Sequence, residues 1–214
     1  MSFEPEQTTE GDQDEPDWAA YYRHTLGREP RPLFTKGMAA ASAVATTPGR
    51  AVEIGFGDGT ETLALLASGW SVLAIDSTPE AAGVLRSRVP EADAGRLTIE
   101  TASGELVDLP PFDLLYSGYA LSFLQPAAFS RFWANLRDRL RPGGLIVLNI
   151  FGVRDTWAGD SSMTFLDSDA VRDLLDGFEV IAIDEEDQDG NSFTGAKHWH
   201  VFDVIARRPV LEQA

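Results

Sequence analysis

The chain has 214 residues, of which 43% are hydrophobic and none is cysteine, and its formal net charge at pH 7 is -17. This length suits one domain with a full-sized core, and the lack of cysteine excludes disulfides, thiolate metal sites and thiol nucleophiles. Acidic residues outnumber basic ones by 34 to 17, so nucleic acid is not expected as a partner.

No apolar run is long enough to span a bilayer. The acidic N-terminus lacks both the basic start and the apolar stretch of a signal peptide. We therefore expect a cytoplasmic protein that does not bind membranes. The sequence leaves its oligomeric state open.

The N-terminal part of the chain divides into a tail and the start of a folded domain. Residues 1–16 are rich in Glu, Asp, Gln, Thr and Pro, and we expect them to form a disordered acidic tail. The domain is expected over residues 17–210. Its first elements are predicted to be helices over 17–27 and 33–45, since the first of these begins at a capping residue and ends at glycine.

From residue 51 onward, short apolar runs alternate with helical patterns. Runs bounded by turn residues are typical of strands buried on both faces, and they occur at 50–55, 71–76, 96–100, 112–118 and 144–152. The helical patterns between them cover 61–69, 78–89 and 126–140. Alternation of this kind predicts βαβ units and a parallel sheet.

The last part of the chain is predicted to close the sheet with a hairpin. A helix is expected over 167–177, then strands over 178–187 and 197–208 with no helical pattern between them. The final strand is therefore expected to be antiparallel and to begin at the sheet edge where parallel strands end, which is where ligands bind in open α/β sheets. Lys197 and His198 are expected at that edge.

A glycine-rich turn follows the first predicted strand. Gly55, Gly57 and Gly59 stand at alternate positions, and a helical pattern follows them. Such a turn lets a ligand contact the backbone, and the helix N-terminus offers free N–H groups. Asp76 ends the second predicted strand, where an acid can accept hydrogen bonds from both ribose hydroxyls. Together these features indicate a nucleoside cofactor.

The spacing of the turn helps to choose among nucleoside cofactors. Dinucleotide-binding proteins have G-x-G-x-x-G, but the third glycine position is Thr60 here. Glu53 adds a carboxylate beside the glycines, which repels pyrophosphate and suits a ligand with an ammonium group. S-adenosylmethionine has an amino-acid end and no phosphate, so it is favoured. The competing interpretation is a turn that needs glycine for its geometry alone.

These segments resemble the motifs of class I S-adenosylmethionine-dependent methyltransferases. "VEIGFGDGTETLALLASGWSVLAID" resembles motifs I and II, "PFDLLYSGYALSF" the fourth-strand motif, and "LRDRLRPGGLIVL" the helix-to-fifth-strand signature. The resemblance covers residues 18–208, and in outline the chain is similar to small bacterial methyltransferases of the tellurite-resistance type. It implies a doubly wound, Rossmann-like α/β sheet of seven strands in the order 3-2-1-4-5-7-6, with strand 7 antiparallel and helices on both faces.

The resemblance also implies the residues that hold the cofactor, S-adenosylmethionine. They are Glu53, Gly55, Phe56, Gly57 and Asp58 in motif I, Asp76 and Ser77 after the second strand, Ala102 and Ser103 after the third, Ser117 and Gly118 after the fourth, and Tyr22 on the first helix. No metal site is expected, because no closely spaced set of His and Asp residues is present.

The acceptor side is predicted from strand polarity. Residues that follow strands four and five, and those that start strand seven, share one edge, so Tyr119, Arg154 and His198 are expected to converge in front of the methyl group. Arg154 would orient an acidic small molecule, and His198 would act as a base if the acceptor must lose a proton. Many relatives have histidines after the fourth strand, where this chain has Ser122 and Phe123.

The predicted function is transfer of a methyl group from S-adenosylmethionine to a small molecule by in-line displacement. The segment "SGYA" lacks the Asn/Asp-Pro-Pro-aromatic motif that the superfamily uses to methylate nucleobase amines. Three alternatives stay open: a cofactor-binding partner protein without catalysis, a protein methyltransferase, and a nicotinamide-dependent oxidoreductase, which Thr60 disfavours.

Overall fold

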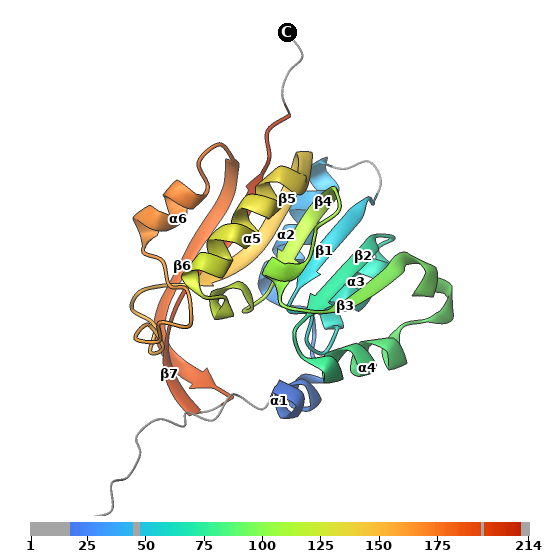
Figure 1. Cartoon of the computed structure of the whole chain (residues 1–214), viewed down its shortest axis with the longest axis horizontal. Helices are drawn as coiled ribbons and strands as arrows, with labels where there is room; N and C mark the ends of the chain where they lie inside the picture. Colours follow the sequence, from blue (N-terminus) through green and yellow to red (C-terminus); the bar gives the residue numbers. More distant parts are fainter. Residues whose placement is uncertain (1–17, 45–47, 194, 211–214) are drawn as a thin grey trace, which may run out of the picture.

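One sheet of seven strands organises the chain, in the order β3-β2-β1-β4-β5-β7-β6 (Figure 1). The computed structural model describes residues 18–44, 48–193 and 195–210, so the predicted tail over 1–16 lies outside the described residues. The strand order is the one that the family resemblance implies, and the prediction of the fold class is confirmed.

The strands lie close to their predicted positions. They are β1 (Arg50–Ile54), β2 (Ser71–Asp76), β3 (Leu97–Thr101), β4 (Phe112–Ser117), β5 (Leu140–Phe151), β6 (Glu179–Ser192) and β7 (Gly195–Arg207). The first five pair in parallel, and β7 is antiparallel to both β5 and β6.

Helices connect the strands and precede the sheet. The α-helices are α1 (Trp18–Thr25), α2 (Pro32–Val44), α3 (Thr60–Ala67), α4 (Pro79–Arg88), α5 (Pro126–Arg139) and α6 (Ser168–Leu174). Short 3-10 turns are η1 (Glu91–Arg96), η2 (Gly104–Leu106) and η3 (Leu121–Phe123). Pro79 and Pro126 stand in the first turns of α4 and α5, where their missing N–H costs no helical hydrogen bond. Among the described residues, no helix combines the length and the apolar character that a bilayer crossing requires.

Two predictions of loops need correction. Residues 188–192 were expected to be a connection but belong to β6, whose pairing with β7 continues to Ser192 opposite Gly195. The strand expected over 144–152 begins earlier, at Leu140, and its pairing with β4 shifts register between Leu140 and Leu145. In the hairpin, backbone pairing with β7 overrides the local preference of Gly and Asn for turns, whereas Gly143 in β5 keeps a positive φ of 83°.

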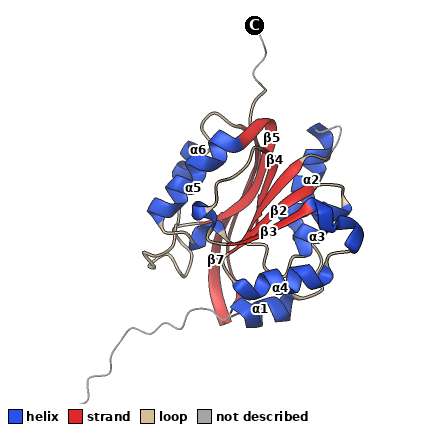
Figure 2. Cartoon of the chain, turned by 45° about the vertical axis from the view of Figure 1, so that its right-hand side comes forward, coloured by secondary structure: helices blue, strands red, loops and turns tan. Residues whose placement is uncertain are grey.

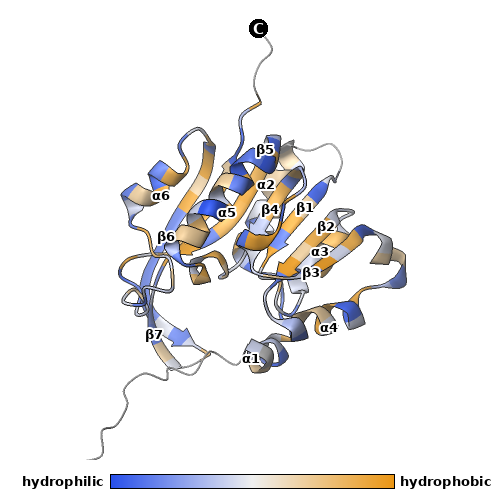
Figure 3. Ribbon diagram, in the orientation of Figure 1, coloured by the Kyte–Doolittle hydropathy of each residue, from blue (hydrophilic) through white to orange (hydrophobic). Residues whose placement is uncertain are grey.

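The sheet is covered on both faces, and Figure 2 shows α2 and α3 on one side and α5 and α6 on the other. Phe132 and Leu136 of α5 pack in one apolar cluster, and Leu65 and Leu66 of α3 pack in the other. The central strands are accordingly apolar along most of their length (Figure 3). Burial on both faces explains why these strands appear in the sequence as continuous apolar runs.

The carboxyl ends of the parallel strands face α1 and the far end of the β6–β7 hairpin (Figures 1 and 2). Phe193 at the hairpin tip contacts Tyr21 and His24 of α1, with ring centroids 5.6 and 5.7 Å apart. Two segments far apart in the sequence thus meet over the edge of the sheet where a ligand is expected.

Candidate functional site

The turn between β1 and α3 forms the floor of the site. Gly55, Gly57 and Gly59 have φ angles of 73°, 54° and 77°, which side chains disfavour. The Gly57 N–H donates to Oδ2 of Asp76 at 2.9 Å. A Cβ on Gly57 would lie 3.0 Å from the ring of Tyr22. The turn therefore needs glycine both for its backbone geometry and for close contact with α1.

Asp76 lies at the end of β2, and only 4% of its surface is exposed. Its carboxylate accepts one backbone N–H from Gly57 and one from Thr78, each at 2.9 Å. A carboxylate has about four acceptor positions, so these bonds leave acceptor capacity on both oxygens. Burial raises the pKa of Asp76, although the two backbone donors act in the opposite direction.

Tyr22 of α1 faces the remaining acceptor positions of Asp76. Its hydroxyl lies 3.3 and 3.4 Å from the two carboxylate oxygens and 3.3 Å from Oγ1 of Thr78. Burial and the negative charge of Asp76 raise the pKa of Tyr22, so it is a neutral phenol. Tyr22 therefore stands where α1 meets the predicted ribose-binding acid.

Two adjoining cavities of about 810 and 570 Å³ run along the carboxyl ends of the strands. Asp76, Ser77, Ala102 and Ser103 line the larger cavity. Gly57, Asp58, Arg28 and Arg31 line the smaller one. Both cavities share the walls that are formed by Trp18, Tyr22, Gly55, Gly118, Tyr119, Phe123 and Trp157. The arrangement is one continuous site with two compartments.

Most of the residues predicted to hold the cofactor line this site. They are Tyr22, Gly55, Phe56, Gly57, Asp58, Asp76, Ser77, Ala102, Ser103 and Gly118. Glu53 and Ser117 instead lie behind the wall. Ser117 donates to the Ile54 carbonyl, and Glu53 accepts a hydrogen bond from Thr62. Complete burial, together with the nearby charge of Glu61, raises the pKa of Glu53 well above its usual range.

Arg28 joins the acids at the start of α3. Its guanidinium donates to both oxygens of Glu61 at 2.5 Å and to Asp58 at 3.3 Å. Burial alone would raise the pKa of Glu61, but the hydrogen bonds and charge of Arg28 lower it. The Arg28 Nε is buried and has no hydrogen-bond partner in the described part of the chain. Arg28 was not predicted as a site residue from the sequence, because the segment around it has the composition of a simple turn.

Arg31 and Tyr116 add polar groups to the smaller cavity. Arg31 donates to the Tyr21 hydroxyl at 3.2 Å, and its Cζ lies 4.8 Å from the ring centroid of Tyr119. Among the described residues, no carboxylate lies at ion-pair distance from its guanidinium. The Tyr116 hydroxyl is buried and lacks a partner in the same part of the chain. A Cβ on Gly118 would meet both side chains, so Arg31 and Tyr116 converge beside that glycine.

The comparisons with known proteins agree with this geometry. Residues 51–144 match the family described as methyltransferase domain. An uncharacterized methyltransferase of Synechocystis sp. is 31% identical over 110 residues, which are 49% of either chain. The chain therefore spans about half the length of this curated relative.

Solved methyltransferases share the fold of most of the chain. One from Methanosarcina mazei, described as an S-adenosylmethionine-dependent methyltransferase, has a TM-score of 0.64 at 18% identity, covering 86% of this chain and 100% of that one. The N-methyltransferase NodS from Bradyrhizobium japonicum, in complex with S-adenosylhomocysteine, has a TM-score of 0.65 at 16% identity, covering 90% and 99%. At these identities the likeness concerns the class I methyltransferase fold.

Tyr119 stands two residues after the end of β4. It lines both compartments, and it is the one described residue other than glycine with a positive φ, at 57°. Its N–H donates to Oδ1 of Asn149 at 2.6 Å, which holds this conformation. Burial raises the pKa of Tyr119 to about 12. Backbone strain beside a cavity is characteristic of functional residues.

Arg154 and His198 do not lie with Tyr119 beside the two compartments, so the expected convergence of the three is corrected. The Arg154 side chain is 53% exposed and donates to Glu185 and Asp187 at 2.6 and 2.7 Å. The His198 side chain is 37% exposed, and its ring nitrogens lie 2.8 Å from Asp187 and Asp189. Neither Arg154 nor His198 lines either of the two compartments.

Alternation along β7 explains the correction. Successive side chains of a strand point to opposite faces. Trp199 lines the smaller compartment, and His198 lies on the other face of the strand. The sequence placed the start of β7 at the correct edge, but strand polarity alone does not say which of two neighbouring residues faces the site.

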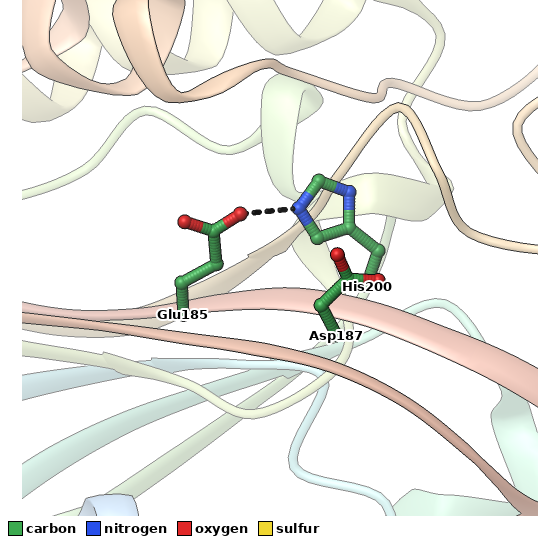
Figure 4. Close-up of side chains that lie close together, drawn as sticks. All are labelled: Glu185, Asp187 and His200. Atoms are coloured by element: carbon green, nitrogen blue, oxygen red, sulfur yellow. Dashed lines mark hydrogen bonds and ion pairs between the residues drawn. The ribbon is translucent and has the colours of Figure 1, made fainter.

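Glu185, Asp187 and His200 lie close together on the outer part of the hairpin, and Figure 4 shows the contact between Glu185 and His200. The His200 Nδ1 accepts the backbone N–H of Arg154 at 3.0 Å, so Nε2 carries the proton and donates to Glu185 at 2.9 Å. The Arg154 guanidinium pairs with both acids. We interpret this cluster as an ion-pair network that ties the β5–α6 loop to the hairpin.

Proposed function

We propose that the chain is a methyltransferase that uses S-adenosylmethionine to methylate a small molecule. The observation that carries this proposal is Asp76, a buried acid with free acceptor positions, which lines a cavity beside the glycine turn. The domain match supports methyl transfer, and the complex of NodS with S-adenosylhomocysteine supports the choice of cofactor.

The nucleoside end of the cofactor fits the larger compartment. Both oxygens of Asp76 can accept a further hydrogen bond, as two ribose hydroxyls require. The adenine would lie against Ala102 and Ser103, which line the same compartment. The Tyr22 hydroxyl bonds weakly to Asp76, at 3.3 and 3.4 Å, so ribose can displace or share this contact.

The amino-acid end fits the smaller compartment. The Arg31 guanidinium forms no ion pair among the described residues, although the Arg31 backbone N–H donates to Glu61, and the buried Tyr116 hydroxyl lacks any partner there. A ligand carboxylate would satisfy both groups, because buried polar atoms without partners are unfavourable. The ammonium group would meet the backbone at Gly55 and Gly118, which line both compartments.

When bound, S-adenosylmethionine supplies a methyl group that is already activated on a sulfonium centre. The chain's own residues then have to align the acceptor and exclude water. We assign alignment to Tyr119, which lines both compartments and is held in a strained backbone conformation. Its phenol stays protonated at neutral pH, so it donates a hydrogen bond and does not act as a base.

Calorimetric titration with S-adenosylhomocysteine and with NAD tests the choice of cofactor. We expect the first to bind and the second not to bind. Tight binding of NAD alone would favour an oxidoreductase and overturn the proposal.

Turnover then separates an enzyme from a cofactor-binding partner protein. Labelled S-adenosylmethionine is incubated with the protein and either a small-metabolite fraction or a protein fraction. Label in small molecules, lost in Asp76→Ala, supports the proposal. Label in polypeptide alone favours a protein methyltransferase, and binding without turnover in either fraction favours the partner protein.

A further inference from the structure

The acceptor end of the smaller compartment is built from aromatic rings of separate segments. We call the rings of Phe151, Trp157 and Trp199 the aromatic wall; they come from the end of β5, the loop after it, and β7. Their ring centroids are 5.8 to 6.1 Å apart. All three line the cavity, and Tyr119 contacts two of them.

A buried cation lies behind this wall. The Lys197 ammonium lies 4.0 Å from the ring centroid of Trp157, 4.2 Å from that of Trp199 and 5.2 Å from that of Phe151. It forms an ion pair with Asp155, and the two side chains are 1% and 0% exposed. Lys197 does not line either cavity.

Asp155 fixes the ammonium in place. Its Oδ1 also accepts the backbone N–H of Trp157 at 3.0 Å, and its Oδ2 accepts the backbone N–H of His200 at 3.3 Å. The same carboxylate thus holds the loop that carries Trp157 and the cation that lies against its ring. A buried ion pair anchored in this way keeps its geometry, because separating the charges would leave each of them unpaired in the interior.

The cation behind the wall decides what can bind in front of it. Aromatic rings attract cations through the negative charge at their faces. The Lys197 ammonium already occupies one face of Trp157 and Trp199, so a second cation at the other face meets a repulsion that the paired Asp155 offsets in part. Arg28 and Arg31 add positive charge in the same compartment. Of its acids, Asp58 and Glu61 are paired with Arg28, and Glu186 is exposed and accepts a hydrogen bond from Gln188. A flat aromatic molecule gains from ring contact without this repulsion.

We propose that the methyl acceptor is a planar aromatic molecule without positive charge, which packs against Trp157 and Trp199. This inference rests on the proposed function, and it names the substrate class of the same site. Lys197 is a positioning residue: it touches no substrate, but it orders the aromatic wall and excludes cationic acceptors.

Binding of three probes to the wild-type protein tests this substrate class. The protein is first saturated with S-adenosylhomocysteine, and 2-naphthol, decahydro-2-naphthol and trimethylanilinium are then titrated calorimetrically. We expect naphthol to bind about two- to tenfold tighter than its saturated counterpart, as ring contacts contribute beyond apolar area. Trimethylanilinium should bind weakest. Equal or tighter binding of trimethylanilinium, or no preference for naphthol, overturns the proposal.

Variants then test whether the aromatic wall causes the preference for naphthol over its saturated counterpart. Trp157→Leu should reduce the ratio between naphthol and its saturated counterpart to within about twofold. Phe178→Leu is the matched control, because the Phe178 ring also carries a cation, Arg137, at 5.0 Å but lies away from both cavities. An unchanged ratio in Trp157→Leu, or an equal loss in the control, contradicts the assignment.

The double variant Lys197→Met with Asp155→Asn tests the role of the buried cation. It removes both charges together, which proteins tolerate better than the loss of one partner. We expect trimethylanilinium to bind at least about fivefold tighter than in the wild type, with naphthol changed less than twofold. Unchanged binding of the cation refutes the role of Lys197. If this variant does not fold, the ranking of probes by the wild type decides the substrate class.

Failure of this proposal can be told apart from failure of the proposed function. If S-adenosylhomocysteine binds and the probes show no aromatic preference, the acceptor class is wrong and the cofactor assignment stands. If S-adenosylhomocysteine does not bind, the proposed function fails, and the same titrations without it still test the wall.

Discussion

Replacing Asp76 with alanine should weaken cofactor binding and also destabilise the fold. Both carboxylate oxygens are assigned to ribose hydroxyls, and a charge-assisted hydrogen bond is worth about 1.5–3 kcal/mol. Because Tyr22 and water can partly replace the lost acceptor, we expect a net loss equal to one such bond. The dissociation constant of S-adenosylhomocysteine should therefore rise about 10- to 150-fold.

The cost to stability follows from the two backbone donors. The N–H groups of Gly57 and Thr78 each donate to Asp76 at 2.9 Å and would lose their acceptor. An unsatisfied buried donor costs about 1–3 kcal/mol, so the two together set a range of about 2–6 kcal/mol. Burial raises the pKa of Asp76, which means that holding the charge inside the fold already costs free energy. We therefore expect a loss at the low end, about 2 kcal/mol.

Calorimetric titration and urea unfolding measure these two quantities. Glu100→Ala is the matched control, since Glu100 is an exposed acid on the neighbouring strand β3, where it pairs with Ile75. The control should change neither quantity. If Asp76→Ala binds S-adenosylhomocysteine as tightly as the wild type, ribose recognition by Asp76 is refuted. If only its stability falls, the acid serves the turn and not the ligand.

Arg28→Ala should lower the free energy of unfolding by about 3–5 kcal/mol, because Glu61 would stay buried without its cation. Urea unfolding measures this loss. The control is Arg139→Ala, which removes an exposed ion pair and should cost less than about 1 kcal/mol. Glu53→Gln should stabilise the protein more at pH 8 than at pH 4, because the raised pKa of Glu53 makes wild-type stability fall as pH rises above the usual Glu range; equal effects at both pH values would contradict this. His198→Ala should lower the thermal midpoint at pH 5.5 and not at pH 8.5, because hydrogen bonds to Asp189 and Asp187 raise the pKa of His198 and this stabilisation is lost as pH rises through that value. The affinity of that variant for S-adenosylhomocysteine should be unchanged, and a loss of affinity would return His198 to the site.

The sequence alone determined the sheet and the position of the glycine turn and of Asp76 along it. Alternating apolar runs and helical patterns predicted the parallel strands, and the missing helix before the last strand predicted the antiparallel β7. These signals are local: a strand buried on both faces must be apolar throughout, and a turn with positive φ favours glycine, as at Gly55 and Gly57. The acid at the end of β2 follows in the same way from strand polarity.

Only the tertiary structure decided which side chains face the site from elements distant in the sequence. Arg28 and Arg31 lie in a segment that resembles a turn. They line the smaller compartment because α1, whose Tyr22 packs on the glycine turn, brings the segment that follows it to the cavity. Glu53 stands beside the glycines in the sequence, but it points into the interior and bonds to Thr62.

The start of β7 shows the same limit most clearly. Lys197, His198 and Trp199 are consecutive, and strand polarity placed them together at one edge. Alternation of side chains puts Trp199 in the cavity wall and His198 on the opposite face with the acids of β6. Lys197 shares the face of Trp199 but is covered by the aromatic rings. The sequence predicts that side chains alternate between the two faces of β7, but it does not say which residues face the cavity. The pairing of β7 with β5 and β6 decides this.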